Sequence, residues 1–175
     1  LGGDKYAVVS DKSANEGFYI FTIDIDSVTG NIRNVVCEDF VECDKGNRDL
    51  EGIAWMPEHG WILMCGERDN MIRAYNRNGK SIGVDIPKHI AHTNLPGNSG
   101  LESLSYNATT QRLWTCNEAA PIMLVAYDDA FNIRESYPYT MDAPKKNGTK
   151  AAAYAHGISE VCAMDDGSLL VLERE

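Results

Sequence analysis

The chain has 175 residues, of which 43% are hydrophobic, and its formal net charge is −10. This composition is typical of one soluble globular domain, and the lack of clustered Lys and Arg excludes a nucleic-acid surface. No run reaches the roughly 18 apolar residues of a membrane span, and the opening segment LGGDKYAVVS lacks the zones of a signal peptide. We therefore expect no membrane span, and we expect any export signal to have been removed already.

Three apolar runs in the first 48 residues predict strands: KYAVVSD, GFYIFTIDID and NIRNVVCEDF. Their alternation and their Val, Ile, Phe and Tyr content favour strands over helices. The chain has five cysteines without CxxC spacing, which argues against a zinc site and against a complete disulfide framework. The pair to test for a disulfide is Cys37 with Cys43.

An internal repeat follows these strands. DLEGIAW at 49–55 is matched by GLESLSY at 100–106, and Glu67 is matched by Glu118, again 51 positions later. Turn signals separate the apolar runs within each unit: MPEHG, NRNGK, NATTQ and DDAFN. Each unit therefore predicts four short strands, and a period of about 50 residues with four strands per period is typical of a β-propeller blade.

The end of the chain predicts a long loop at 145–157, with a helical turn in KAAAYA, and then two strands in HGISEVCAMDDGSLLVLERE. We predict an all-β fold, a β-propeller of four-stranded antiparallel blades. The expected divisions are a partial blade at 1–48, blades at 49–99 and 100–156, and a partial blade at 157–175. Complete strand sets are expected at 49–87 and 100–138, giving about three and a quarter blades of a larger propeller. An open arrangement, or one completed by self-association through bare blade edges, is the alternative.

The repeated acids acquire a common location in this fold. First strands begin, and second strands end, at the same rim of a propeller channel, so carboxylates distant in sequence should meet there. The rim set is Glu51, Glu67, Glu102, Glu118 and Glu173. Calcium takes six to eight oxygen ligands, so we expect these glutamates to form a calcium site. The alternatives are that they are solvated loop ends or that they cap backbone donors between blades.

Three residues of the rim are candidates for catalysis. His156 is the histidine that falls at the acidic rim, and Glu67 and Glu118 close the second strands there. Arg68 and Arg174, near the same rim, could bind an anionic substrate. No G-x-S-x-G nucleophile elbow is present, and scattered serines define no Ser-His-Asp triad.

Three segments carry a family resemblance: DLEGIAW, NSGLESLSYNATTQRLWTCNEAAP and HGISEVCAMDDGSLLVLERE. Over residues 49–175 the chain resembles the bacterial phytase-like propeller proteins described as having esterase-like activity of phytase. The resemblance implies a secreted or periplasmic protein that hydrolyses a phosphate or carboxylate ester at an acidic, calcium-bearing channel mouth. It implies metal ligation by the five rim glutamates and anion contacts by Arg68 and Arg174. The run AAPI after Glu118 departs from such a site, since it offers no side-chain oxygen.

Two functions therefore remain open. One is a phytase-like ester hydrolase whose metal activates a water molecule. The other is a non-enzymatic propeller that binds a small ligand or a protein on the same face.

Overall fold

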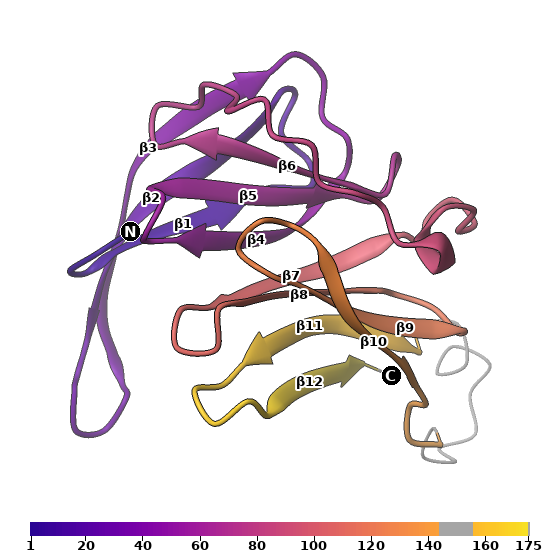
Figure 1. The fold of residues 1–175 in the computed structure, drawn as a ribbon. Coiled ribbons are helices and arrows are strands. Elements are labelled where there is room, and N and C mark those ends of the chain that lie inside the picture. Colours follow the sequence, from indigo (N-terminus) through magenta and orange to yellow (C-terminus); the bar gives the residue numbers. More distant parts are fainter. Residues whose placement is uncertain (144–155, 175) are drawn as a thin grey trace.

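The computed structural model describes residues 1–143 and 156–174 (Figure 1). These residues form twelve β-strands in four antiparallel sheets, together with one short 3-10 turn, which confirms the expected all-β class. The helical turn expected in KAAAYA lies outside the described residues. No helix in the two described ranges is long and apolar enough to cross a membrane.

The first sheet contains β1 (Lys5–Val9), β2 (Glu16–Ile25) and β3 (Ile32–Asp44), in that order. Its strands correspond to the three apolar runs of the sequence. β1 packs beside β4 (Leu50–Met56) of the next sheet, and the core between the two sheets includes Phe18, Leu50 and Tyr75. All five cysteines are free, so Cys37 and Cys43 are not joined.

The second sheet has three strands, in contrast to the four predicted at 49–87. They are β4, β5 (Trp61–Gly66) and β6 (Met71–Asn76). After β6 the chain makes one isolated bridge, between Tyr75 and Ser81, and then runs without strand pairing to the 3-10 turn at Ile90–His92. The alternating Ile82, Val84 and Ile86 pack on the core and so imitate a strand. Gly83 at φ +71° and Pro87, which has no backbone N–H, disfavour a continuous ladder there.

The third sheet has the four predicted strands: β7 (Leu101–Asn107), β8 (Arg112–Asn117), β9 (Ile122–Tyr127) and β10 (Ile133–Tyr139). The fourth sheet pairs β11 (Gly157–Ala163) with β12 (Leu169–Arg174). Figure 1 shows the sheets following one another in chain order, with β4, β7 and β11 on adjacent sheets. Apolar cores fill the spaces between the second and third sheets and between the third and fourth.

β4 and β7 pack closely against each other. A Cβ atom on Gly52 would lie 2.6 Å from the backbone nitrogen of Leu104 and 2.7 Å from the carbonyl carbon of Ser103. Backbone atoms cannot yield as a flexible side chain can, so glycine is required at this position for the observed packing. The glycine of DLEGIAW is thus explained by contact between sheets.

The sequence repeat is also a repeat of backbone geometry. β4 and β7 each contain an irregularity immediately after their first residue, and the residue that it leaves unpaired is Glu51 in one strand and Glu102 in the other. β11 has the same irregularity at Ser159. Because a bulge turns one side chain out of the normal alternation, it directs both glutamates differently from their strand neighbours.

Candidate functional site

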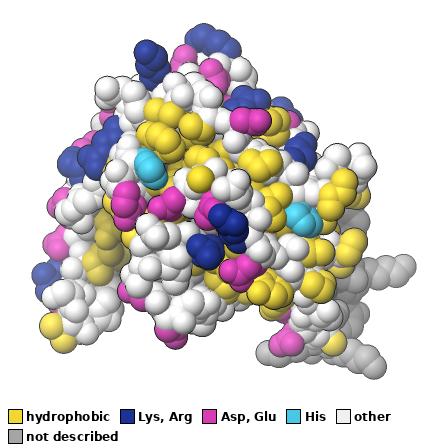
Figure 2. All heavy atoms as spheres, viewed as in Figure 1, with side chains coloured by type: hydrophobic (Ala, Val, Ile, Leu, Met, Phe, Trp, Pro, Cys, Tyr) yellow, Lys and Arg dark blue, Asp and Glu magenta, His cyan; other side chains and the backbone are white. Residues whose placement is uncertain are grey.

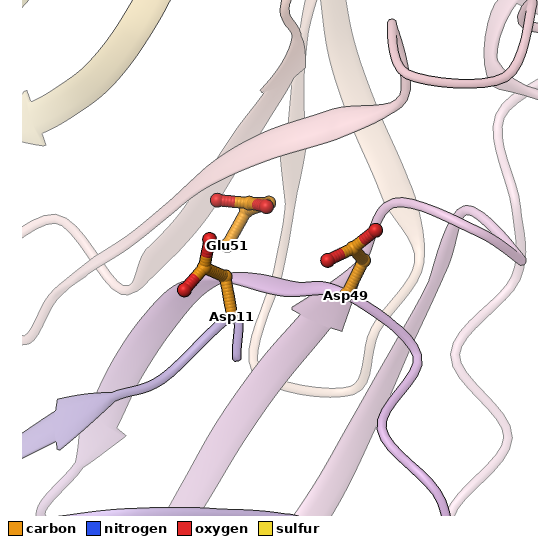
Figure 3. Close-up of side chains that lie close together, drawn as sticks. All are labelled: Asp11, Asp49 and Glu51. Carbon is orange, nitrogen blue, oxygen red and sulfur yellow. The ribbon is translucent and has the colours of Figure 1, made fainter. Parts of the chain in front are cut away.

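The first acidic cluster lies where the first and second sheets meet (Figure 3). Asp11 follows β1, Asp49 precedes β4, and Glu51 occupies the bulge of β4. One carboxylate oxygen from each of the three lies within 4.8 Å of the others. Asp49 has φ +59°, a left-handed conformation that brings its side chain to this group.

The second acidic cluster consists of Glu67, Glu102 and Glu118, whose carboxylate oxygens also lie within 4.8 Å of one another. Glu67 and Glu118 occupy equivalent places after β5 and β8. The N–H of Glu67 donates to Asp49 O at 2.8 Å, and that of Glu118 donates to Gly100 O at 2.9 Å. The sequence placed these three glutamates at one rim, and the structure brings them together.

The two clusters act on each other electrostatically. Burial, followed by the charges of Glu67, Asp11 and Asp49, raises the pKa of Glu51 to about 7. Burial, followed by the charge of Glu51, raises the pKa of Glu102 to about 7 as well. Six carboxyl groups therefore share one crowded, partly desolvated region, in which a bound cation would lower the cost of ionisation.

Arg174 supplies the cation of the second cluster. It forms an ion pair with Glu118, and its guanidinium lies 3.9 Å from Glu102. Arg174 pairs with Gly157 in the fourth sheet. This position is equivalent to that of Glu67 in the second sheet and of Glu118 in the third. The third repeat thus carries an arginine at the position of the glutamate.

The prediction that Glu173 shares this position does not match the register. Glu173 is one residue earlier, and successive residues of a strand point to opposite faces. Its carboxylate accepts the hydroxyl of Tyr139 at 2.7 Å and the N–H of Asp142 at 3.0 Å. Glu173 therefore joins β12 to the end of β10 and lies outside both acidic clusters.

An open pocket of about 570 Å³ adjoins the second cluster. Glu118 and Arg174 line it together with His156 and residues 97–99, so this histidine lies beside the second cluster. Arg68 lies at the other end of the region, 3.4 Å from Asp49, with 68% of its side chain exposed. Figure 2 shows acidic and basic side chains close together on the face it presents.

Comparison with known proteins identifies the family of this chain. The family model described as phytase-like, esterase-like activity of phytase, matches residues 2–175. The chain belongs to this phytase-like family. The match extends the resemblance seen at 49–175 across the first sheet. No curated protein matches the chain.

Three solved structures are similar to this phytase-like chain. A protein of unknown function from Bacteroides caccae has 12% identity and a TM-score of 0.50, covering 97% of this chain and 50% of its own. Hydrazine synthase from Kuenenia stuttgartiensis has 12% identity and a TM-score of 0.49, with 94% and 40% covered. A glucose dehydrogenase has 10% identity and a TM-score of 0.48, with 98% and 74% covered. The phytase-like chain spans half the length of the Bacteroides caccae protein, with which it shares a fold.

Sequence reasoning left several residues of the phytase-like site without a role. Asp11 and Asp49 complete the first cluster, although the predicted ligand set contained only glutamates. Glu160 is a further carboxyl group near Glu102, and partial burial raises its pKa. The signal for Asp49 was its place directly before the repeated Leu-Glu pair. Glu160 gave no such signal, because it corresponds to Ser103, the residue after the bulge, and not to either repeated glutamate.

A buried ion pair between Arg48 and Glu16 lies next to the first cluster and stabilises the backbone there. Two nitrogens of Arg48 donate to the carboxylate of Glu16 at 2.6 and 2.8 Å, and the hydroxyl of Tyr75 donates to the same group at 2.7 Å. Burial alone would raise the pKa of Glu16, but the bonds from Arg48 outweigh it and hold that pKa below its usual value. Arg48 directly precedes Asp49, so this network fixes the backbone that carries the cluster.

Proposed function

We propose that this phytase-like chain is a calcium-dependent hydrolase of phosphate or carboxylate esters, acting at the acidic mouth of a β-propeller. In this proposal the four sheets are consecutive blades, divided near residues 48, 99 and 156, and form about three and a quarter blades of a larger ring. The adjacency of β4, β7 and β11 supports it, as does the fold shared with a protein twice as long.

The observation that carries the proposal is the convergence of six carboxylates from three sheets. Hard cations such as calcium bind carboxylate oxygens, and two neighbouring groups of three carboxylates suit such an ion chemically. The ligands would be Glu51, Glu67, Glu102 and Glu118, with Asp11 and Asp49 added and Glu173 omitted. Bound calcium would neutralise the acids and polarise the ester oxygen.

The remaining chemistry falls to side chains of the chain itself. Arg174 and Arg68 would bind the anionic oxygens of the ester. Glu118 or Glu67 would accept a proton from the attacking water, whose oxygen forms the new bond to phosphorus or to the acyl carbon. As the bond to the alcohol oxygen breaks, His156 would donate a proton to that oxygen.

Two further expectations belong to the same proposal. A secreted or periplasmic location suits a carboxylate-rich calcium site, because extracellular modules bind calcium with affinities of about 10⁻⁴ to 10⁻³ M. Self-association would use the edge strands β1 and β12, where Tyr6, Val8, Leu170 and Leu172 are exposed.

The test combines calcium binding with turnover. Calcium should raise the melting temperature of the purified protein and support hydrolysis of a generic phosphate or carboxylate ester. Glu67→Gln and Glu118→Gln should reduce both effects. Glu58→Gln removes the same charge from the turn at the opposite end of β4 and should leave both unchanged. Calcium binding without hydrolysis of any ester in a broad panel would favour the alternative, a propeller that only binds a ligand.

A further inference from the structure

Residues 119–122, the apolar run AAPI, do not contribute to the acidic clusters. They begin directly after Glu118 and line two neighbouring pockets. Ala119 belongs to the polar pocket of Arg174 and Glu118, whereas residues 120–122 line a second pocket of about 410 Å³. His156 lines both pockets, so the two adjoin at this histidine.

The second pocket has a different chemical character from the first. Pro138, Tyr139, Thr140 and Met141 also line it, and Tyr139 pairs with Ile122 in the third sheet. Apart from Thr140 and His156, its lining side chains are apolar or aromatic, and no charged residue appears among those described. A polar pocket with an arginine thus continues into an apolar crevice, and a histidine marks the boundary.

Both walls of the apolar crevice are held by specific hydrogen bonds. The amide nitrogen of Asn117, which is fully buried, donates to Ala119 O at 2.6 Å and to Pro121 O at 3.2 Å. The amide oxygen of Asn117 accepts from Met123 N at 2.9 Å. On the other wall, Glu173 accepts from the Tyr139 hydroxyl and from Asp142 N. The crevice is therefore preformed, as ligand pockets usually are.

We propose that the substrate is a phosphate monoester of an apolar alcohol, aryl or alkyl, with its phosphate at Arg174 and His156 and its apolar group in the crevice of residues 120–122 and 138–141. This inference rests on the proposed function and narrows it. Arg174 provides a guanidinium suited to phosphate oxygens, and the crevice offers apolar surface next to it. A phosphate ester of a small hydrophilic alcohol would leave this surface exposed to water.

The test measures binding of inert phosphonates by calorimetry in the presence of calcium. Phenylphosphonate should bind the purified protein about tenfold more tightly than methylphosphonate, since burying a ring in the crevice contributes roughly 1.4 kcal/mol or more. Met141→Ser should abolish this difference and leave methylphosphonate binding unchanged. Pro138→Ser is a second variant with the same expected effect. Met164→Ser removes an exposed methionine from the turn after β11 and should change neither affinity.

The outcomes separate this inference from the proposed hydrolase. If phenyl phosphate and glycerol phosphate are hydrolysed equally well and Met141→Ser affects both alike, the substrate inference is overturned while the hydrolase stands. If phenylphosphonate binds preferentially but no ester is cleaved, the crevice is a ligand site and the hydrolase is wrong. Failure of both phosphonates to bind overturns the inference outright.

Discussion

Glu102 provides the sharpest test of the crowded acidic region. Its side chain is 11% exposed, and its pKa is raised to about 7 from an ordinary value of 4.5. The folded protein therefore keeps this proton to about pH 7, whereas the unfolded chain loses it near pH 4.5. Since the folded state binds more protons between these values, the metal-free protein should become less stable as the pH rises from about 4.5 to about 7.

The size of the effect follows from the shift. The difference between 4.5 and about 7, at about 1.4 kcal/mol per pKa unit, sets an upper limit of about 3.5 kcal/mol for Glu102. Solvent and side-chain rearrangement reduce it, so we expect about 1–3 kcal/mol. Glu102→Gln removes this pH-dependent cost. Relative to the wild type, the metal-free variant should gain that much stability between about pH 4 and about pH 8.

Urea denaturation with EDTA at both pH values measures the difference directly. Because the comparison is made between two pH values, any change in packing caused by glutamine cancels. In the presence of calcium at the higher pH, the wild type should be more stable than Glu102→Gln, since the variant has lost a ligand and is stabilised less by the ion. Glu58→Gln serves as the control. An equal effect of Glu102→Gln at both pH values would show that this carboxyl group is neither crowded nor desolvated in the folded protein.

Three other substitutions probe different contacts. Arg48→Met leaves the fully buried Glu16 without its partner and should lower the free energy of unfolding, measured with urea, by about 3–5 kcal/mol. Lys45→Met, which breaks an exposed pair with Glu42, should lower it by less than about 1 kcal/mol. Similar losses in the two variants would contradict the support assigned to Arg48. Gly52→Ala should destabilise the fold by about 1–3 kcal/mol, because the added Cβ would meet the backbone of β7. In Gly97→Ala the added Cβ would meet nothing within 4 Å, so the stability should not change. An unchanged melting temperature for Gly52→Ala would refute the close packing. Arg174→Gln should tighten calcium binding and weaken phosphonate binding in calorimetry, because it removes a cation beside Glu118; parallel changes in both affinities would argue against its assigned role.

Much of the fold could be predicted because the repeat encodes it. The spacing of Glu51 to Glu102 and of Glu67 to Glu118 identified equivalent strands, and the third sheet has its four strands as expected. The missing fourth strand of the second sheet could not be read in the same way. Ile82, Val84 and Ile86 alternate as a strand does, but they are held by contact with the core and not by a ladder.

The site residues that could be predicted from the sequence are those that lie at the ends of predicted strands. Placing Glu67, Glu102 and Glu118 together required only the order of the strands. Choosing between Glu173 and Arg174 required the pairing of β11 with β12 to be known to a single residue, because adjacent residues of β12 point to opposite faces. The pairing of Glu16 with Arg48 joins two sheets and leaves no repeating signal in the sequence.

Anomalous diffraction from crystals soaked in calcium at about pH 8, where both raised carboxyl groups are ionised, would test the central claim most directly. The account predicts an anomalous peak among the oxygens of Asp11, Asp49 and Glu51, of Glu67, Glu102 and Glu118, or between the two clusters. A well-ordered map without any peak at these carboxylates, or with calcium bound only elsewhere, would contradict it.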